Sequence, residues 1–162
     1  MKKKLAYFWI IYFILISIIG YLSINHTNFI SMVNQKPVDI KFNSIFLNNI
    51  KVFYSILMSG LVTFGIGALY IIFINAVTFG AGVKSCLISG KSLGLILTHG
   101  FIEMFMFILS AIITSYVLYV FIFKNKQEFI NELKNVFKLF VYGNLGIFIA
   151  AFIEVFISTK FL

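Results

Sequence analysis

The stretch LGLILTHGFIEMFMFILSAIITSYVLYVFIF, from Leu93 to Phe123, sets a histidine and a glutamate in an otherwise apolar run. About 20 consecutive apolar residues suffice for a helix to cross a bilayer, so this run is ample for one crossing and too short for two. An ionised carboxylate near the centre of such a helix costs about 2.5–3.5 kcal/mol even on the most lenient insertion scale. We therefore expect Glu103 to face the interior of a helix bundle and to find a partner there.

The composition extends this conclusion to the whole chain. Of its 162 residues, 61% are hydrophobic and only 11% are charged, and the mean hydropathy is +1.04. A soluble domain is about half apolar and about a quarter charged. All 13 basic residues are lysines, and they lie mainly in short polar segments between apolar runs, where they would meet anionic lipid headgroups. A nucleic-acid-binding module needs a soluble surface to carry a basic patch, so we expect no nucleic-acid partner.

The amino-terminal part of the chain predicts one span and one loop. Three lysines precede the apolar run Leu5 to Leu22, which indicates an anchor span (1–22) whose amino end is cytoplasmic by the positive-inside rule. No convincing small-x-small cleavage site follows the run, which argues against a signal peptide. The polar segment 23–51, which contains His26 and the only proline, predicts an extracytoplasmic loop.

A second span is expected from about Lys51 to about Phe79. This is longer than one crossing requires, and tilt or an interfacial end can absorb the excess. Small and polar residues recur on one of its faces at multiples of four, a spacing that lets helix backbones approach closely. We predict that this face packs against neighbouring helices through Ser59, Gly60, Thr63 and Gly67.

The glycine-rich segment GAGVKSCLISGKSLG, from Gly80 to Gly94, predicts a break in the helical pattern. Lys84 and Lys91 argue against a full crossing, so a cytoplasmic loop or a shallow re-entrant turn is expected. Its SGKS lacks the full phosphate-loop pattern and follows no predicted strand. Cys86 is the only cysteine, which excludes an internal disulfide and a cysteine-based zinc cluster.

The carboxyl-terminal part begins with KNKQEFINELKNVFKLF, in which apolar residues recur at helical spacing among lysines and glutamates. This pattern predicts an amphipathic helix at the membrane interface, leading into a last span from about Phe137 to about Ser158. The expected fold is all-α: a polytopic transmembrane helical bundle in a single membrane domain (1–162), with four full spans, one interfacial amphipathic helix, and an extra re-entrant segment left open. Four spans would put the lysines of the amphipathic helix outside, against the charge rule, whereas a fifth insertion in the glycine-rich segment would remove that conflict.

Two of the five acidic residues, Glu103 and Glu154, lie within predicted spans. His99 precedes Glu103 by four residues, so the two share one face of a helix. Small residues share a face with Glu154 on the last span. We predict an intramembrane polar cluster of His99, Glu103, Glu154 and Asn75, and a packing surface on the last span formed by Gly143, Ala150 and Ala151.

Three interpretations of this cluster stay open. It holds the helices together without chemistry, it lines a path for a proton, an ion or a peptide, or it binds a metal ion in an intramembrane enzyme. Histidine and glutamate at helical spacing can hold zinc, but the two-histidine pattern of zinc helices is absent. We favour the first interpretation and expect no enzymatic activity, no catalytic residue, no cofactor and no metal.

The order of these elements resembles the stage II sporulation protein M family of small bacterial membrane proteins, over residues 46–162. The resemblance is carried by Asn49 at the start of a span, THGFIE, which includes Glu103, and IAAFIEVFIS, which includes Glu154. It also includes Gly60, Gly65 and Gly67 within the second span and Asn75 at its end. Ala76 and Thr98 depart from the pattern, where the family has a glycine and a proline.

The resemblance implies a component of the bacterial cytoplasmic membrane and cell envelope that acts through partners. The family's founding member looks like a scaffold for cell-wall hydrolases in forespore engulfment, and others look like accessory subunits of transporters or components of bacteriocin production and immunity. We therefore expect a non-enzymatic scaffold or accessory protein that contacts membrane lipid and other envelope proteins: cell-wall hydrolases, transporter subunits or a bacteriocin peptide. The alternative is a transport or immunity component for a peptide or an ion; an intramembrane metalloenzyme is the third candidate.

Overall fold

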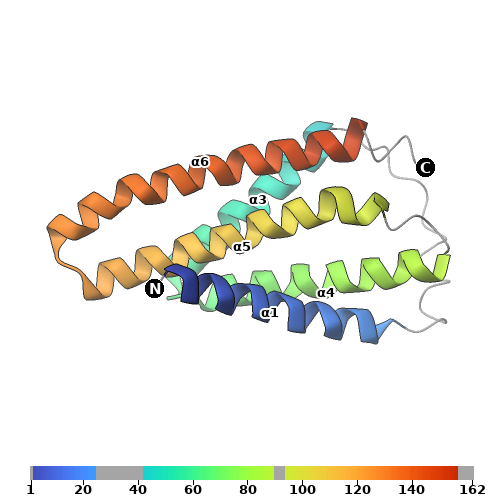
Figure 1. Ribbon diagram of the computed structural model, residues 1–162, viewed down its shortest axis with the longest axis horizontal. Coiled ribbons are helices and arrows are strands. Elements are labelled where there is room, and N and C mark those ends of the chain that lie inside the picture. Colours follow the sequence, from blue (N-terminus) through green and yellow to red (C-terminus); the bar gives the residue numbers. More distant parts are fainter. Residues whose placement is uncertain (1, 25–41, 90–93, 157–162) are drawn as a thin grey trace.

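The computed structural model describes residues 2–24, 42–89 and 94–156, and for 2 and 94–99 the backbone alone. These residues form long helices that are joined by short turns where the connections are described (Figure 1). Each helix is long and apolar enough to cross a membrane, which confirms the all-α, multi-pass character of the chain. The helices are α1 (Lys2–Ser23), α3 (Phe42–Val62), α4 (Ile66–Ser89), α5 (Gly94–Phe123) and α6 (Lys126–Phe156).

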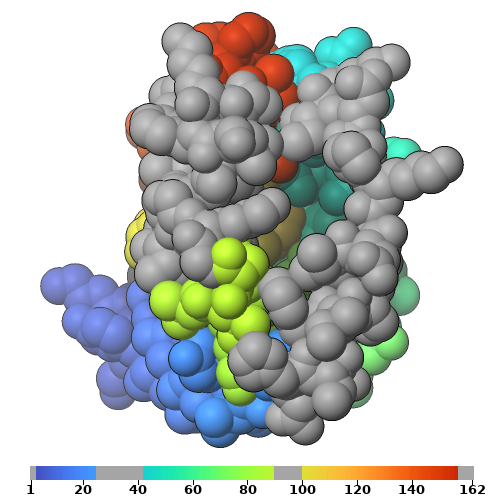
Figure 2. All heavy atoms as spheres, turned by 90° about the vertical axis from the view of Figure 1, so that its right-hand side faces the viewer, coloured from blue at the N-terminus to red at the C-terminus, as the bar shows by residue number. Residues whose placement is uncertain are grey.

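The helices run back and forth along one bundle axis (Figure 1). The start of α1, the α3–α4 turn and the α5–α6 turn lie at one end of the bundle. Figure 2 looks onto the other end, where α6 and the start of α3 lie above the ends of α4 and α1. The largest fully buried side chains include Phe53, Ile72, Phe107 and Ile147, so the core lies where α3, α4, α5 and α6 meet.

The expected single span from Lys51 to Phe79 is wrong, because the chain reverses direction at Thr63–Gly65. Phe64 and Gly65 adopt φ angles of 52° and 99°, and the Gly65 amide donates to the carbonyl of Gly60 at 2.7 Å, which closes α3. A left-handed glycine is the usual way to end a helix. The Thr63 hydroxyl then accepts from the amide of Gly67 at 2.6 Å and caps the start of α4.

The start of α3 and the end of α4 correct two further expectations. α3 begins at Phe42, within the segment expected to be an extracytoplasmic loop, while residues 25–41 and His26 lie outside the described residues. The glycine-rich segment is helical from Gly80 to Ser89 as the last turns of α4, and residues 90–93 lie outside the described part. The fifth apolar helix therefore arises from the α3–α4 turn, and the expected break at Gly80 is absent.

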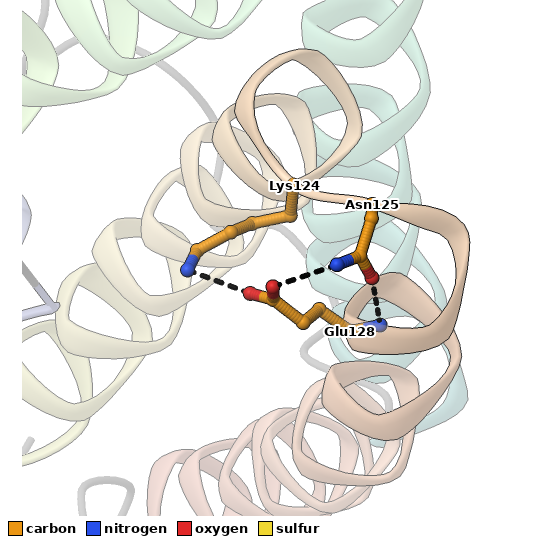
Figure 3. A network of polar contacts seen from close by, with 3 residues as sticks. All are labelled: Lys124, Asn125 and Glu128. Carbon is orange, nitrogen blue, oxygen red and sulfur yellow. Dashed lines mark hydrogen bonds and ion pairs between the residues drawn. The ribbon is translucent and has the colours of Figure 1, made fainter.

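The expected interfacial helix and the last span are one continuous helix, α6, of 31 residues. No proline or strained residue interrupts it, and its first half keeps its apolar side against the bundle, where Val136, Leu139 and Phe140 pack on the core. An electrostatic cap fixes its start (Figure 3). Asn125 Oδ1 accepts from the Glu128 amide at 2.9 Å, and Lys124 Nζ lies 2.6 Å from Glu128 Oε2.

Two glycines allow α1 and α4 to touch along their backbones. A Cβ at Gly20 would collide with the backbone of Val77, and a Cβ at Gly80 would collide with the backbone of Ser17 and Tyr21. Small residues permit such close helix contacts where no hydrophobic force drives association. Neither glycine belongs to the packing surface expected from the sequence.

The residues that were expected to pack lie in several different contacts. A Cβ at Gly60 would lie 2.6 Å from Thr114 Cγ2, so α3 passes close to α5 there. At Gly67 it would lie 2.6 Å from Cβ of Ser59, and at Gly143 2.5 Å from Cζ of Phe53. The remaining residues of this set are the turn residue Thr63 and the fully buried Ala150 and Ala151.

Candidate functional site

Glu103 is the one acidic or basic residue among the buried side chains that the structure describes, with 9% of its surface exposed. It lies on α5 and faces the interior of the bundle. Asn49 of α3, also buried, donates a hydrogen bond from Nδ2 to Glu103 Oε1. Glu154 of α6 shares a further hydrogen bond with the Glu103 carboxyl group. Three helices therefore meet at a single carboxyl group.

The chemistry of this contact follows from its donors and acceptors. An ionised carboxylate can only accept, so a hydrogen bond between two carboxyl groups requires a proton on one of them. Two carboxyl groups this close together in a low-dielectric interior are unfavourable when both are ionised. The Asn49 amide can donate to the Glu103 carboxyl group whether that group is ionised or neutral. The contact ties α3, α5 and α6 together.

The structure brings together two of the four residues of the expected cluster, Glu103 and Glu154. Asn75 is on α4, and its amide donates to the carbonyl of Ile71 in its own helix at 2.8 Å. His99 lies one helical turn before Glu103 on α5, and its side chain is outside the described part of the molecule.

Asn49 is the cluster residue that sequence reasoning missed. It was singled out only as an element of the family resemblance, because the segment around it was expected to be a loop. Its position near the start of an apolar helix is the signal that could have found it, since a polar side chain there needs an inward partner.

Two comparisons with known proteins bear on this arrangement. A family model for stage II sporulation protein M matches residues 9–159. The chain belongs to the stage II sporulation protein M family. The match includes most of α1, so it extends the resemblance seen over 46–162 towards the amino terminus.

One relative of this family member is an uncharacterized protein of Methanocaldococcus jannaschii. The two are 31% identical over 159 residues, which cover 88% of this chain and 87% of the relative. No solved structure matches the chain.

In this stage II sporulation protein M family member, three residues that carry the resemblance meet in space. Asn49, Glu103 and Glu154 are far apart in the sequence and come from three helices. One of the three glycines of the same pattern, Gly65, forms the turn between α3 and α4. The pattern thus includes both a polar contact between helices and a turn of the chain.

Other polar side chains also tie helices together. Ser110 Oγ of α5 donates to the backbone carbonyl of Phe53 in α3 at 2.8 Å. Trp9 Nε1 of α1 donates to Ser115 Oγ of α5 at 3.0 Å. Among the described residues, no group of three or more histidine, cysteine or acidic side chains is placed to hold a metal ion. Among the described residues, the polar partners of the Glu103 carboxyl group are the amide of Asn49 and the carboxyl group of Glu154.

Proposed function

We propose that this family member is a non-enzymatic, multi-pass protein of the bacterial cytoplasmic membrane that serves as a scaffold or accessory subunit for partner proteins of the cell envelope. The contact of Glu103 with Asn49 and Glu154 supports this proposal. The contact pairs the buried polar groups of α3 and α5 with each other and with the half-buried Glu154 of α6, and so favours a fixed bundle. The outer faces of the helices remain apolar and are free to contact lipid or the spans of a partner.

We further propose that the helices cross the membrane five times, with the amino end in the cytoplasm. In this topology four crossings, by α1, α3, α4 and α5, separate the start of α1 from the α5–α6 turn, so both lie on the same side, as they do in Figure 1. The lysines of the amino terminus and the four from Lys124 to Lys138 are then all cytoplasmic, in accord with the positive-inside rule. A four-span topology would have set these two groups on opposite sides.

The orientation can be tested with single cysteines in a Cys86→Ala chain. Cysteines at Phe64 and Asn125 should both react with an impermeant maleimide only when the cytoplasmic face is opened, since both residues are in turns at the same end of the bundle. Labelling of the two positions from opposite faces would contradict the five-span arrangement.

The scaffold role is tested by the conservative change Glu103→Gln. The glutamine oxygen still accepts from Asn49 and its amide still donates to Glu154, so a structural tie should survive. Photo-crosslinkers at exposed positions such as Tyr70 or Phe105 should give the same discrete envelope-protein adduct in cells with either chain. Loss of that adduct on Glu103→Gln, with the melting temperature unchanged, would count against a purely structural pair.

The closeness of two carboxyl groups within the bundle favours a second candidate, a transport or immunity component that moves a proton, an ion or a peptide. In proteoliposomes such a protein would show flux that Glu103→Gln abolishes, because the amide cannot exchange a proton. A scaffold should show no flux with either chain, so this single assay separates the two candidates.

A further inference from the structure

An open groove of about 760 Å³ lies between α3, α5 and α6, away from the carboxyl pair. Its walls are almost entirely apolar and include Met58 of α3, Val117 of α5 and Phe137 of α6. Met58 and Phe137 are largely exposed, at 63% and 66%, in a chain that the bilayer surrounds. Whatever fills the groove is therefore apolar over most of its length.

The groove also has a charged feature. Lys134 and Lys138 are the two charged residues that line it, and they lie one helical turn apart on α6. The nearby acidic side chains have other partners: Glu128 pairs with Lys124, and Glu132 accepts from the amide of Asn135. The two lysines contact the groove through their apolar stems and are otherwise exposed, and no acidic residue is among the lining residues.

The contact between Gly60 and Thr114 fixes the depth of these lysines. Thr114 is in the groove, so Lys134 and Lys138 are close to the level at which α3 ends, at Val62. α5 continues from Thr114 to Phe123, about 14 Å at about 1.5 Å per residue, so the α5–α6 turn projects beyond the other helices (Figure 1). The lysines therefore lie close to the level of the α3–α4 turn, at the end of the bundle where α3 and α4 meet.

We propose that this groove binds an anionic phospholipid, with an acyl chain along the apolar walls and the headgroup phosphate on Lys134 and Lys138. The charge of the lining and its position at the end of α3 select this occupant. A zwitterionic lipid would fill the apolar part but would gain less from the two lysines. The helix of a partner protein would need carboxylates at the same level to match the two charges.

The proposal is tested by native mass spectrometry of the full chain, titrated with phosphatidylglycerol or with phosphatidylcholine of the same acyl chains. Phosphatidylglycerol should bind more tightly. Lys134→Gln/Lys138→Gln should weaken it about thirtyfold, since each basic residue near an anionic surface is worth about fivefold. The matched control, Lys3→Gln/Lys4→Gln, removes the same charge at the same end of the bundle but outside the groove and should change little.

A second pair of variants tests the apolar walls. Met58→Trp should fill the groove and weaken binding of both lipids, whereas Ile66→Trp, at an equally exposed position outside the groove, should not. Equal losses in the two lysine variants, or equal binding of the two lipids, would overturn the proposal. Disulfide-linked dimers of Met58→Cys in a Cys86→Ala chain would do the same, because they would show that a second copy occupies the groove.

Discussion

Replacing Asn49 by leucine tests whether the polar contact stabilises the bundle. The change keeps the size of the side chain and removes the amide that donates to Glu103. Both residues are buried, at 7% and 9% exposure, so water cannot replace the lost bond. A hydrogen bond to a charged group is worth about 1.5–3 kcal/mol, whereas neutral bonds between membrane helices average about 0.6 kcal/mol. We expect a loss of about 2 kcal/mol, because removing the donor leaves a buried carboxyl oxygen without its hydrogen bond.

A double-mutant cycle isolates the contribution of the contact. In a Glu103→Gln chain, Asn49→Leu removes only a neutral bond, so it should cost about 0.6 kcal/mol and leave a coupling of about 1.4 kcal/mol. Reversible unfolding in mixed micelles can be followed by the fluorescence of Trp9, the single tryptophan, which is buried and bonded to Ser115.

Asn75→Leu provides the control, because the Asn75 amide bonds to a carbonyl of its own helix. That carbonyl keeps its place in α4, so the control should cost under about 0.5 kcal/mol. Equal losses at Asn49 and Asn75, or a coupling near zero, would refute the view that the contact across three helices carries the stability.

Three further predictions follow from the packing and the turns. Gly80→Leu should separate α1 from α4, because its side chain would collide with the backbone of Ser17; quenching of the tryptophan by brominated lipid should rise in this variant. At the α3–α4 turn, Gly65→Val should lower stability by about 1–2 kcal/mol in micelle unfolding, whereas Gly65→Asn, which tolerates a positive φ, should lower it less. The hydrogen bond and charge of Glu128 raise the pKa of Lys124 above its usual value. The pair should therefore stabilise the α5–α6 turn fully at a pH below the usual lysine pKa, and the stabilisation should be lost as the pH rises through the raised pKa. An NMR titration of the Lys124 Nζ should show a pKa above that of an unpaired lysine.

The sequence was sufficient to predict the helical membrane class and the inward position of Glu103, because long apolar runs and the cost of a charge in lipid leave few alternatives. It did not predict the α3–α4 turn. Thr63, Phe64 and Gly65 are nearly as apolar as the helices that they connect, so hydropathy shows no gap between the two spans. The excess length of the expected span and the presence of Gly65 were the available signals.

Periodicity predicts which face of a helix turns inward, but it does not predict which helix that face meets. The sequence places Asn49 at the start of an expected span and Asn75 at its end. Asn49 contacts Glu103, whereas Asn75 bonds to a carbonyl of its own helix. The difference depends on the packing of α3 against α5, which brings Asn49 to Glu103. For the same reason the close approach of Gly20 to α4 could not be predicted from α1 alone.

The depth of the carboxyl pair bears on the choice between scaffold and transport. Along α5, Glu103 lies about 16 Å from Thr114, which is at the level of the lysine-lined groove, and about 14 Å from the start of the helix at Gly94. The pair lies towards the end of the bundle away from the groove, because Glu154 is two residues from the end of α6 at Phe156 and Asn49 is seven residues from the start of α3 at Phe42. Towards the groove, the next polar side chains of α5 are Ser110 and Thr114, both fully buried, and the Ser110 hydroxyl donates to a backbone carbonyl. Transport would require a path from the pair to both surfaces, and on the groove side that path meets these packed residues, whereas a structural tie requires access from neither surface.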